Sequence, residues 1–228
     1  MKPVALITGG ARAIGRAIAS DLAADHTVVI TYHTTPPDAL LADQPDIMAI
    51  PADLSDPQVA LDIIHQVITR YGRLDVIVNN AGSIHMDDMD PAANFAVNVA
   101  APMALLDAAR PHLHRGASII NISSLNAELP AMGAVGFSAS KAALNTWTRG
   151  MAKTLGPQGI RVNGIAPGAI ERPEDPRPPE LVKAFVGMTA LGRSGVPEDI
   201  AKVVRFLASD AAGFITGEII TVSGGYRL

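Results

Sequence analysis

The chain has 228 residues, of which 48% are hydrophobic and 18% charged, and its formal net charge is −4. Disordered chains combine low hydrophobicity with high net charge, so this composition excludes disorder, and the lack of a long basic run argues against nucleic acid as the main partner. The sequence contains no cysteine and no run near the ~18 apolar residues of a membrane span. We therefore expect a cytoplasmic protein without disulfides, cysteine-bound zinc or membrane association.

Short apolar runs alternate with helical patterns along the chain. The first run, 4–7, is too short for a signal peptide. The runs typical of buried strands are 4–7, 27–32, 47–50, 75–78, 118–122, 161–165 and 218–222. The helical patterns cover 14–24, 56–71, 92–113, 136–155, 180–188 and 197–208. In the helix over 56–71, Ser55 and Gln58 form a predicted capping box, and Gly72 is expected to end the helix. This alternation predicts one α/β domain over 1–228, a doubly wound parallel sheet (Rossmann fold) that binds ligands at the carboxyl ends of its strands.

The loop between the first strand and the first helix is rich in glycine. Glycine lets backbone N–H groups approach a pyrophosphate, and the helix N-terminus adds partial positive charge. The alternative is that Gly9 and Gly10 only form a strand-to-helix turn. From Thr8 to Gly15 the loop resembles the T-G-x-x-x-G-x-G motif of the short-chain dehydrogenase/reductase family. Ala13 replaces the middle glycine and adds one methyl group near the pyrophosphate.

Other motifs of that family follow in the same order, between Val4 and Gly225. The stretch 79–82 matches N-N-A-G, and 167–170 resembles the P-G-x-[IV] that touches the nicotinamide carboxamide. Arg172 stands where the family often has threonine. The positions that the resemblance implies for cofactor binding are Gly9, Arg12, Ala13, Ile14, Gly15, Tyr32, His33, Asp53, Leu54, Asn80, Ala81, Gly82, Lys141, Pro167, Gly168 and Ile170.

The second strand ends in Tyr32 and His33, without the carboxylate that binds the ribose 2′-hydroxyl in NAD enzymes. Arg12 lies where NADP-using members of the family often have a basic residue, and a guanidinium binds phosphate through two hydrogen bonds. We therefore expect NADP(H) rather than NAD(H), unless Arg12 is a solvated loop residue. By the resemblance, Asp53 accepts from the adenine amino group; the alternative is a local turn.

The resemblance implies four catalytic positions, of which three match. Asn98, Ser124 and Lys141 are present, but Phe137 stands where the family's Y-x-x-x-K motif has tyrosine. Residues at i and i+4 share a helix face, and a lysine there lowers the pKa of a phenol, which then exchanges a proton near neutral pH. Ser124 would hydrogen-bond the carbonyl oxygen, Lys141 would also hold the ribose hydroxyls, and Asn98 would position a water. Phe137 has no proton to give.

Three explanations for Phe137 remain open. The chain is a natural family member with weak or no turnover, it is an engineered tyrosine replacement, or another group donates the proton. The candidate donors are Ser124, a water held by Lys141, and His85, whose alternative reading is a solvated loop histidine. The Phe137 ring also fits plain core packing. The main hypothesis is an impaired NADP(H)-dependent oxidoreductase of a carbonyl or alcohol compound. The second is a dinucleotide-binding protein without turnover, acting as a sensor or an oligomer partner.

The segment 171–190 corresponds to the family's substrate lid, and its prolines should stiffen it. The substrate is expected to be a small molecule, which the sequence does not identify. We assign no role to Ser138 and Ser140, and the scattered histidines suggest no metal site. Two helices carry more apolar residues than one buried face needs, so we expect a homo-oligomer, either a dimer or a tetramer. These residues are Phe95, Val97, Val99, Met103, Leu105, Leu106, Leu144, Trp147 and Met151.

Overall fold

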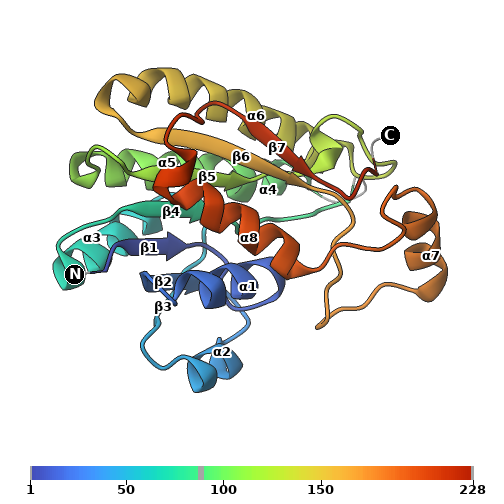
Figure 1. Cartoon of the computed structure of the whole chain (residues 1–228), viewed down its shortest axis with the longest axis horizontal. Helices are drawn as coiled ribbons and strands as arrows, with labels where there is room; N and C mark the ends of the chain where they lie inside the picture. Colours follow the sequence, from blue (N-terminus) through green and yellow to red (C-terminus); the bar gives the residue numbers. More distant parts are fainter. Residues whose placement is uncertain (1, 87–89, 227–228) are drawn as a thin grey trace.

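A computed structural model describes residues 2–86 and 90–226 of the chain. Within these residues, seven parallel strands form one sheet in the order β3-β2-β1-β4-β5-β6-β7 (Figure 1). The direction of winding changes between β1 and β4, which confirms the predicted doubly wound sheet. The strands are β1 (Val4–Ile7), β2 (Thr27–Tyr32), β3 (Met48–Pro51), β4 (Val76–Asn79), β5 (Ser118–Ile122), β6 (Arg161–Pro167) and β7 (Ile219–Val222).

The described residues form a single domain, in which helices cover both faces of the sheet. On one face, α1 (Ala13–Leu22) packs beside α8 (Pro197–Ala208), and α2 (Asp38–Asp43) adds Leu40 to the same core (Figure 1). On the other face lie α3 (Val59–Tyr71), α5 (Ala101–Ala109) and α6 (Val135–Leu155). Strands buried on both faces have to be apolar throughout, which is why they read as short continuous runs.

The helix predicted over 56–71 begins later than expected. Gly72 does cap it in the left-handed conformation (φ 71°), as predicted. The capping box is wrong, because the Ser55 hydroxyl donates to Asp53 (2.8 Å) and the Asp56 carboxylate accepts from the Gln58 amide (2.9 Å). These short-range bonds hold residues 53–58 in turns, so the helix starts at Val59. Side-chain acceptors near a helix start often compete with the helix in this way.

The long helix predicted over 92–113 is a run of different turns. It consists of α4 (Pro91–Phe95), a π-helical turn (Ala96–Ala100), α5, and a 3₁₀ turn (Arg110–His112). Pro102 explains the π-helical turn, because proline has no amide hydrogen and its ring clashes with the carbonyl four residues earlier, here that of Asn98. Residues 91–112 are long and apolar enough to cross a membrane. In this fold they pack against α3 and α6, which accounts for that apolar character.

The segment after β6 projects beyond the carboxyl ends of the strands and carries α7 (Pro179–Gly187), which stands apart from the sheet in Figure 1. The start of this segment is fixed by a parallel bridge between Ile170 and Gly195. Helix α7 corresponds to the helix predicted over 180–188, shifted by one residue. Helix α2 had no counterpart among the predicted elements.

Candidate active site

A cavity of about 820 Å³ opens at the carboxyl ends of the strands and extends from the loop after β1 to the segment that carries α7. The structure gathers nearly all the predicted site residues on its wall. These are Gly9, Arg12, Ala13, Ile14, Gly15, Tyr32, His33, Asp53, Leu54, Asn80, Ala81, Gly82, Ser124, Phe137, Lys141, Pro167, Gly168 and Ile170. The exception is Asn98, which is buried behind the wall with 1% of its surface exposed.

The glycine-rich loop is folded tightly against the end of β4. Gly9 has a positive φ of 64°, and a Cβ placed on Gly15 would lie 2.1 Å from the Gly9 carbonyl oxygen. The side-chain amide of Asn80 donates to the carbonyl oxygens of Thr8 (2.9 Å) and Gly9 (3.0 Å). The Thr8 hydroxyl oxygen accepts from the backbone amides of Asn80 (3.0 Å) and Ala81 (2.9 Å). Glycine is therefore required at 15, and the loop is rigidly placed.

Ala13 adopts the left-handed conformation (φ 45°), as no other non-glycine residue of the described chain does. The sequence indicated only a mild change, one extra methyl group near the pyrophosphate. The structure shows that the main cost is in the backbone, since an L-residue pays roughly 1–2 kcal/mol in this region. A glycine would adopt the same conformation without that strain.

Arg12 of the glycine-rich loop, His33 after β2 and Asp53 after β3 all line the cavity. Arg12 is exposed and lines the cavity. The Asp53 carboxylate accepts from the amide (3.0 Å) and hydroxyl of Ser55, and these bonds hold the pKa of Asp53 below its usual value. Its second oxygen lies 3.8 Å from His33 Nε2. Asp53 thus forms a turn and faces the cavity at once, so the two readings of this residue are compatible.

Lys141 and Phe137 form the deep corner of the cavity. Both lie in the first two turns of α6, and Lys141 Nζ lies 5.9 Å from the centre of the Phe137 ring. The ammonium group donates to the Ile122 carbonyl oxygen at 2.8 Å. Burial lowers the pKa of Lys141 to about 8. The corner therefore holds a cation that is partly deprotonated in mildly basic solution, next to a ring that carries no oxygen.

Ser124 lies at the end of β5 and caps the 3₁₀ turn Leu125–Ala127. Its oxygen accepts from the Asn126 amide at 3.1 Å. A serine hydroxyl has one hydrogen to donate as well as two acceptor lone pairs, so this capping bond leaves the donor function usable toward a ligand.

Asn98 clamps the loop that follows β4 rather than facing the cavity with its side chain. Its oxygen accepts from the Ser83 amide, and its nitrogen donates to the Ser83 carbonyl and to the Ser140 hydroxyl, each at 2.9 Å. Ser140 in turn donates to the Phe137 carbonyl at 2.6 Å. Sequence reasoning gave Ser140 no role; the structure shows that it ties the π-helical turn to α6.

A second asparagine, missed by sequence reasoning, repeats this clamp. Asn94 is fully buried; its oxygen accepts from the His85 amide (2.8 Å) and its nitrogen donates to the His85 carbonyl (3.1 Å). His85 is consequently fixed in the cavity wall. Asn94 and Asn98 are spaced i, i+4 within an apolar helix, which places them on one face. Two asparagines at this spacing in an apolar helix could have been predicted from the sequence to have a shared structural role.

The segment that carries α7 and the chain after β7 also contribute to the cavity. Arg177, Phe185 and Tyr226 line it, and none of them was predicted. The Arg177 guanidinium donates to the Ile170 carbonyl (2.5 Å) and lies 5.6 Å from the centre of the Phe185 ring. Burial lowers the pKa of Arg177 from its usual value. These residues follow no short motif, so only the fold reveals them.

The doubly wound sheet, with its cavity where the winding changes direction, defines a Rossmann-fold protein. Over residues 9–227 the sequence matches the family described as enoyl-(acyl carrier protein) reductase. An uncharacterized oxidoreductase of Methylorubrum extorquens is 36% identical, covering 98% of this chain and 97% of its own. The chain belongs to the short-chain dehydrogenase/reductase family of oxidoreductases.

Two solved structures are similar over nearly the whole length. A short-chain dehydrogenase from Burkholderia cenocepacia in complex with NADP has a TM-score of 0.93 and 34% identity, over 99% of this chain and 98% of that chain. A blue fluorescent protein from a metagenomic library, in complex with NADPH, has the same TM-score, identity and coverage.

Proposed function

We propose that the protein binds NADP(H) in this cavity and is a carbonyl or alcohol oxidoreductase of the short-chain type, impaired by Phe137. The observation that carries the proposal is the continuity of one cavity, which joins the glycine-rich loop to the corner formed by Ser124, Phe137 and Lys141. A dinucleotide that spans this cavity would bring its nicotinamide to that corner.

The residues of the cavity fit such a cofactor. Because Gly15 has no Cβ, the loop can fold tightly against the start of α1, where N–H groups and the helix dipole favour phosphate. We assign the amides of Ile14 and Gly15 to the pyrophosphate and the Arg12 guanidinium to a 2′-phosphate. The two NADP-containing relatives support this choice over NAD(H).

The remaining contacts are assigned by position in the cavity. Tyr32, His33, Asp53 and Leu54 would surround the adenosine. The backbone of Asn80, Ala81 and Gly82 would lie against the ribose, and Lys141 would hold its hydroxyls. The carboxamide would contact the stretch at the end of β6, formed by Pro167, Gly168 and Ile170.

When bound, the cofactor supplies or accepts a hydride. The chain's own residues have to bind the substrate oxygen and move a proton to or from it. Ser124 has a hydroxyl hydrogen to donate to that oxygen, and the Lys141 ammonium adds positive charge nearby. Asn98, whose side chain is bonded to Ser83 and Ser140, would position the water of a proton relay only indirectly, by holding the wall of the cavity in place. Phe137 supplies no proton, and general acid–base catalysis is worth roughly 10²–10⁴-fold.

A second function is favoured by the same residue. If neither Ser124, His85 nor a water held by Lys141 replaces the phenol, the protein is an NADP(H)-binding protein without turnover. Its cradle and its lysine corner are complete in either case, so cofactor binding does not separate the two functions. Turnover does.

The test compares this chain with Phe137→Tyr in NADPH oxidation over a panel of aldehydes and ketones. We expect turnover in the tyrosine variant and roughly 10²–10⁴-fold less in this chain. Equal rates would contradict the assigned impairment and direct attention to His85. No turnover in either form, with a melting temperature still raised by NADPH, would favour the binding protein. No stabilisation by NADPH or NADH would contradict both functions.

We further propose a homo-oligomer in the cytoplasm, with residues 171–190 as the lid over the substrate. Phe95 and Met103 leave 40% and 41% of their surfaces exposed, whereas Leu105, Leu106 and Leu144 are buried. The exposed pair, together with Trp147 and Met151 on α6, supports an association surface. Light scattering would test it, with Met103→Glu expected to shift the mass toward the monomer.

A further inference from the structure

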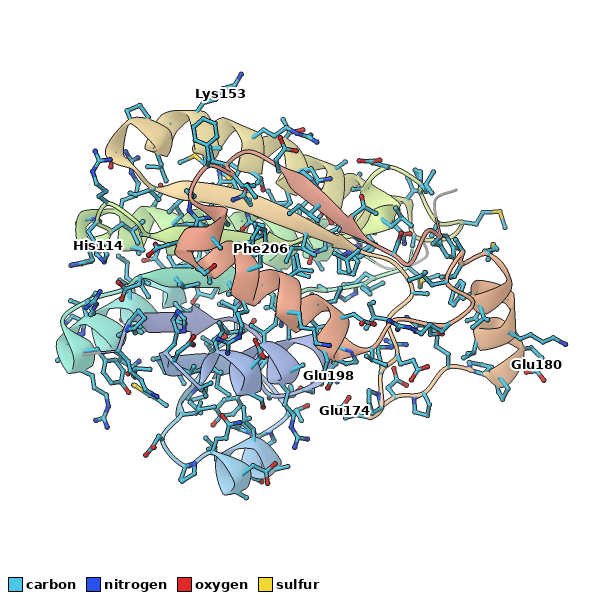
Figure 2. The ribbon with its side chains drawn as sticks, in the orientation of Figure 1. His114, Lys153, Glu174, Glu180, Glu198 and Phe206 are labelled. Atoms are coloured by element: carbon cyan, nitrogen blue, oxygen red, sulfur yellow. The ribbon has the colours of Figure 1, made fainter. Side chains whose placement is uncertain are left out.

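The loop from Ile170 to Arg177 is closed into a compact unit. The Arg177 guanidinium donates to the Ile170 carbonyl at its base (2.5 Å), and Ile170 is anchored by its bridge to Gly195. Within the loop, Arg172 and Asp175 form an ion pair (3.1 Å), and the Asp175 amide donates to the Arg172 carbonyl (3.0 Å). These contacts, with the prolines on either side, present Glu174 at the tip of the loop (Figure 2).

Glu174 makes a contact far from its own segment. Its carboxylate oxygen Oε1 accepts from the backbone amide of Ala13 at 3.2 Å. Ala13 is the first residue of α1, whose N-cap Arg12 makes no side-chain cap and whose first turn holds no acidic residue. The first amides of a helix have no partner within the helix, and negative charge is favoured there. Glu174 therefore supplies from the lid the anion that the start of α1 lacks locally.

The same place is where a dinucleotide would put its phosphates. Ala13 lies inside the glycine-rich loop, between Gly9 and Gly15, and lines the cavity next to Ile14. A carboxylate and a pyrophosphate are both anions that seek these N–H groups, and two anions there repel each other. The contact of Glu174 with Ala13 and a bound pyrophosphate are thus alternatives.

We propose that Glu174 acts as a built-in competitor for the cofactor phosphates, an inference that rests on the proposed NADP(H) site. The loop docks on the cradle through its carboxylate, and cofactor binding displaces it. Displacement frees the tip of the lid segment, so occupancy of the cradle is coupled to the position of the lid. A site whose competent form is populated about one-tenth of the time binds about tenfold more weakly.

The experiment measures the dissociation constant of NADPH by fluorescence titration on the full chain. The variant Glu174→Gln keeps the shape of the side chain and removes its charge, and Glu174→Ala removes the contact. The matched control is Glu180→Gln, which makes the same charge change in α7 on the exposed side of the same segment, as Figure 2 shows. Hydrogen exchange of residues 170–178, with and without NADPH, provides a readout of the loop itself.

We expect both Glu174 variants to bind NADPH about 3–10-fold more tightly than this chain, with Glu180→Gln unchanged. We also expect NADPH to raise exchange in residues 170–178 of this chain and to change it little in Glu174→Ala. Unchanged or weaker binding in Glu174→Gln would overturn the competitor and leave the proposed cofactor site standing. An equal gain in Glu180→Gln would reduce the effect to general charge and overturn it too. No NADPH binding in any of the four proteins would contradict the cofactor site itself, and the competitor with it.

Discussion

The buried charges of Asp75 and Lys141 lie at opposite ends of the sheet and have opposite surroundings. At the amino ends of the strands, Asp75 and Arg205 each have an opposite charge beside them. The Asp75 carboxylate accepts from Arg73 (2.5 and 2.8 Å), from His114 (2.8 Å) and from the Val4 amide (2.7 Å). Burial raises the pKa of Asp75, but the bonds from Arg73 and Val4 outweigh it and hold this pKa below its usual value.

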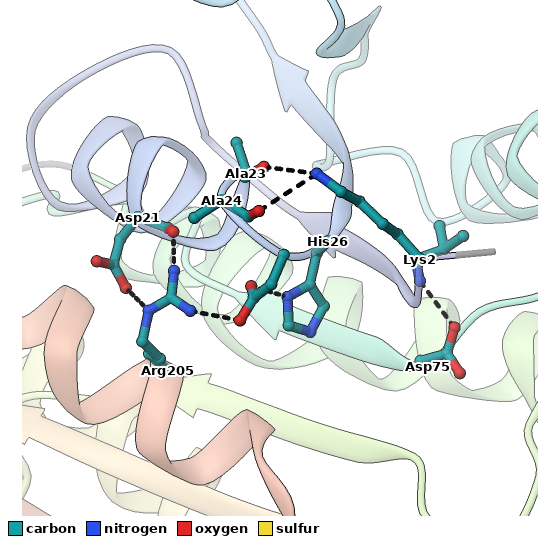
Figure 3. A network of polar contacts seen from close by, with 9 residues as sticks. Lys2, Asp21, Ala23, Ala24, His26, Asp75 and Arg205 are labelled. Carbon is teal, nitrogen blue, oxygen red and sulfur yellow. Dashed lines mark hydrogen bonds and ion pairs between the residues drawn. The ribbon is translucent and has the colours of Figure 1, made fainter.

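Arg205 shows the same pattern at the same end, where α8 meets α1. Its guanidinium contacts the carboxylates of Asp21 (2.5 Å) and Asp25 (2.6 Å), as well as the Asp21 carbonyl (Figure 3). Lys2 donates to the carbonyl oxygens of Ala23 and Ala24 beside it. These contacts join segments far apart in the sequence, and their role is to hold the fold together.

At the carboxyl ends, Lys141 is buried and burial is what shifts its pKa, with no carboxylate contributing. A lowering from its usual value to about 8 corresponds to about 3 kcal/mol of unfavourable desolvation. The paired charge of Asp75 stabilises the fold, whereas the unpaired charge of Lys141 is kept beside the cavity at a cost to stability.

The largest expected effect comes from restoring a proton donor beside this cation. Phe137→Tyr should raise carbonyl reduction roughly 10²–10⁴-fold, because the Lys141 ammonium would favour the ionised phenol. Steady-state NADPH oxidation measures the gain. The control is Phe95→Tyr, which adds the same oxygen on the exposed side of the long helix and should leave the rate as it was.

Breaking the pairing at the amino end should cost the most stability. Asp75→Asn leaves Arg73 and His114 without their carboxylate, and we expect a loss of about 2–4 kcal/mol at pH 7 by urea denaturation. The folded-state pKa of Asp75 is lowered, so its contribution is present above its unfolded pKa and is lost as pH falls through the folded value. The gap between variant and parent should close below about pH 4. A gap that persists there would show that packing, not charge, is responsible.

Removing the unpaired cation should act in the opposite direction. Lys141→Met should stabilise the apo protein by about 1–2 kcal/mol at pH 7, less than the full desolvation cost because the Ile122 carbonyl loses its donor. Lys141 is neutral in the folded state above about pH 8 and charged in the unfolded state up to its usual pKa near 10.4. Between these values the unfolded chain binds more protons, so parent stability rises with pH and the variant's advantage should shrink. Thermal unfolding at pH 7 and pH 9.5 tests the sign.

The smallest effect is expected at the α1–α8 contact. Arg205→Met removes two ion pairs that are about one-third exposed on the arginine side, and such pairs contribute about 0–1 kcal/mol each. We expect the variant to lose about 1 kcal/mol of unfolding free energy, measured by urea denaturation. This difference from the parent should be smaller in 0.5 M NaCl, because salt screens the ion pairs. A loss as large as that of Asp75→Asn would remove the distinction between exposed and buried pairing.

The strands and most helices could be predicted because their signals are local. Apolar runs marked all seven strands to within one or two residues, and Gly72 marked a helix end through its own conformation. The start of α3 could not be predicted, because Asp53 accepts from the Ser55 hydroxyl and Asp56 accepts from the Gln58 amide, so neither group is left for the predicted capping box. Among the residues that were missed, Ser140, Arg177 and Glu174 contact partners that only the fold brings together. The strain at Ala13 depends on a backbone angle that no residue name reveals.

The π-helical turn before Pro102 changes what the long helix can do. One extra residue in a turn rotates everything upstream by about 100° relative to everything downstream. The upstream part, α4 with the π-helical turn, packs against α6, and the downstream part, α5, packs against α3. The long helix thus packs one side against α6 and a different side against α3. A proline that would weaken an ordinary helix here lets one element serve two neighbours.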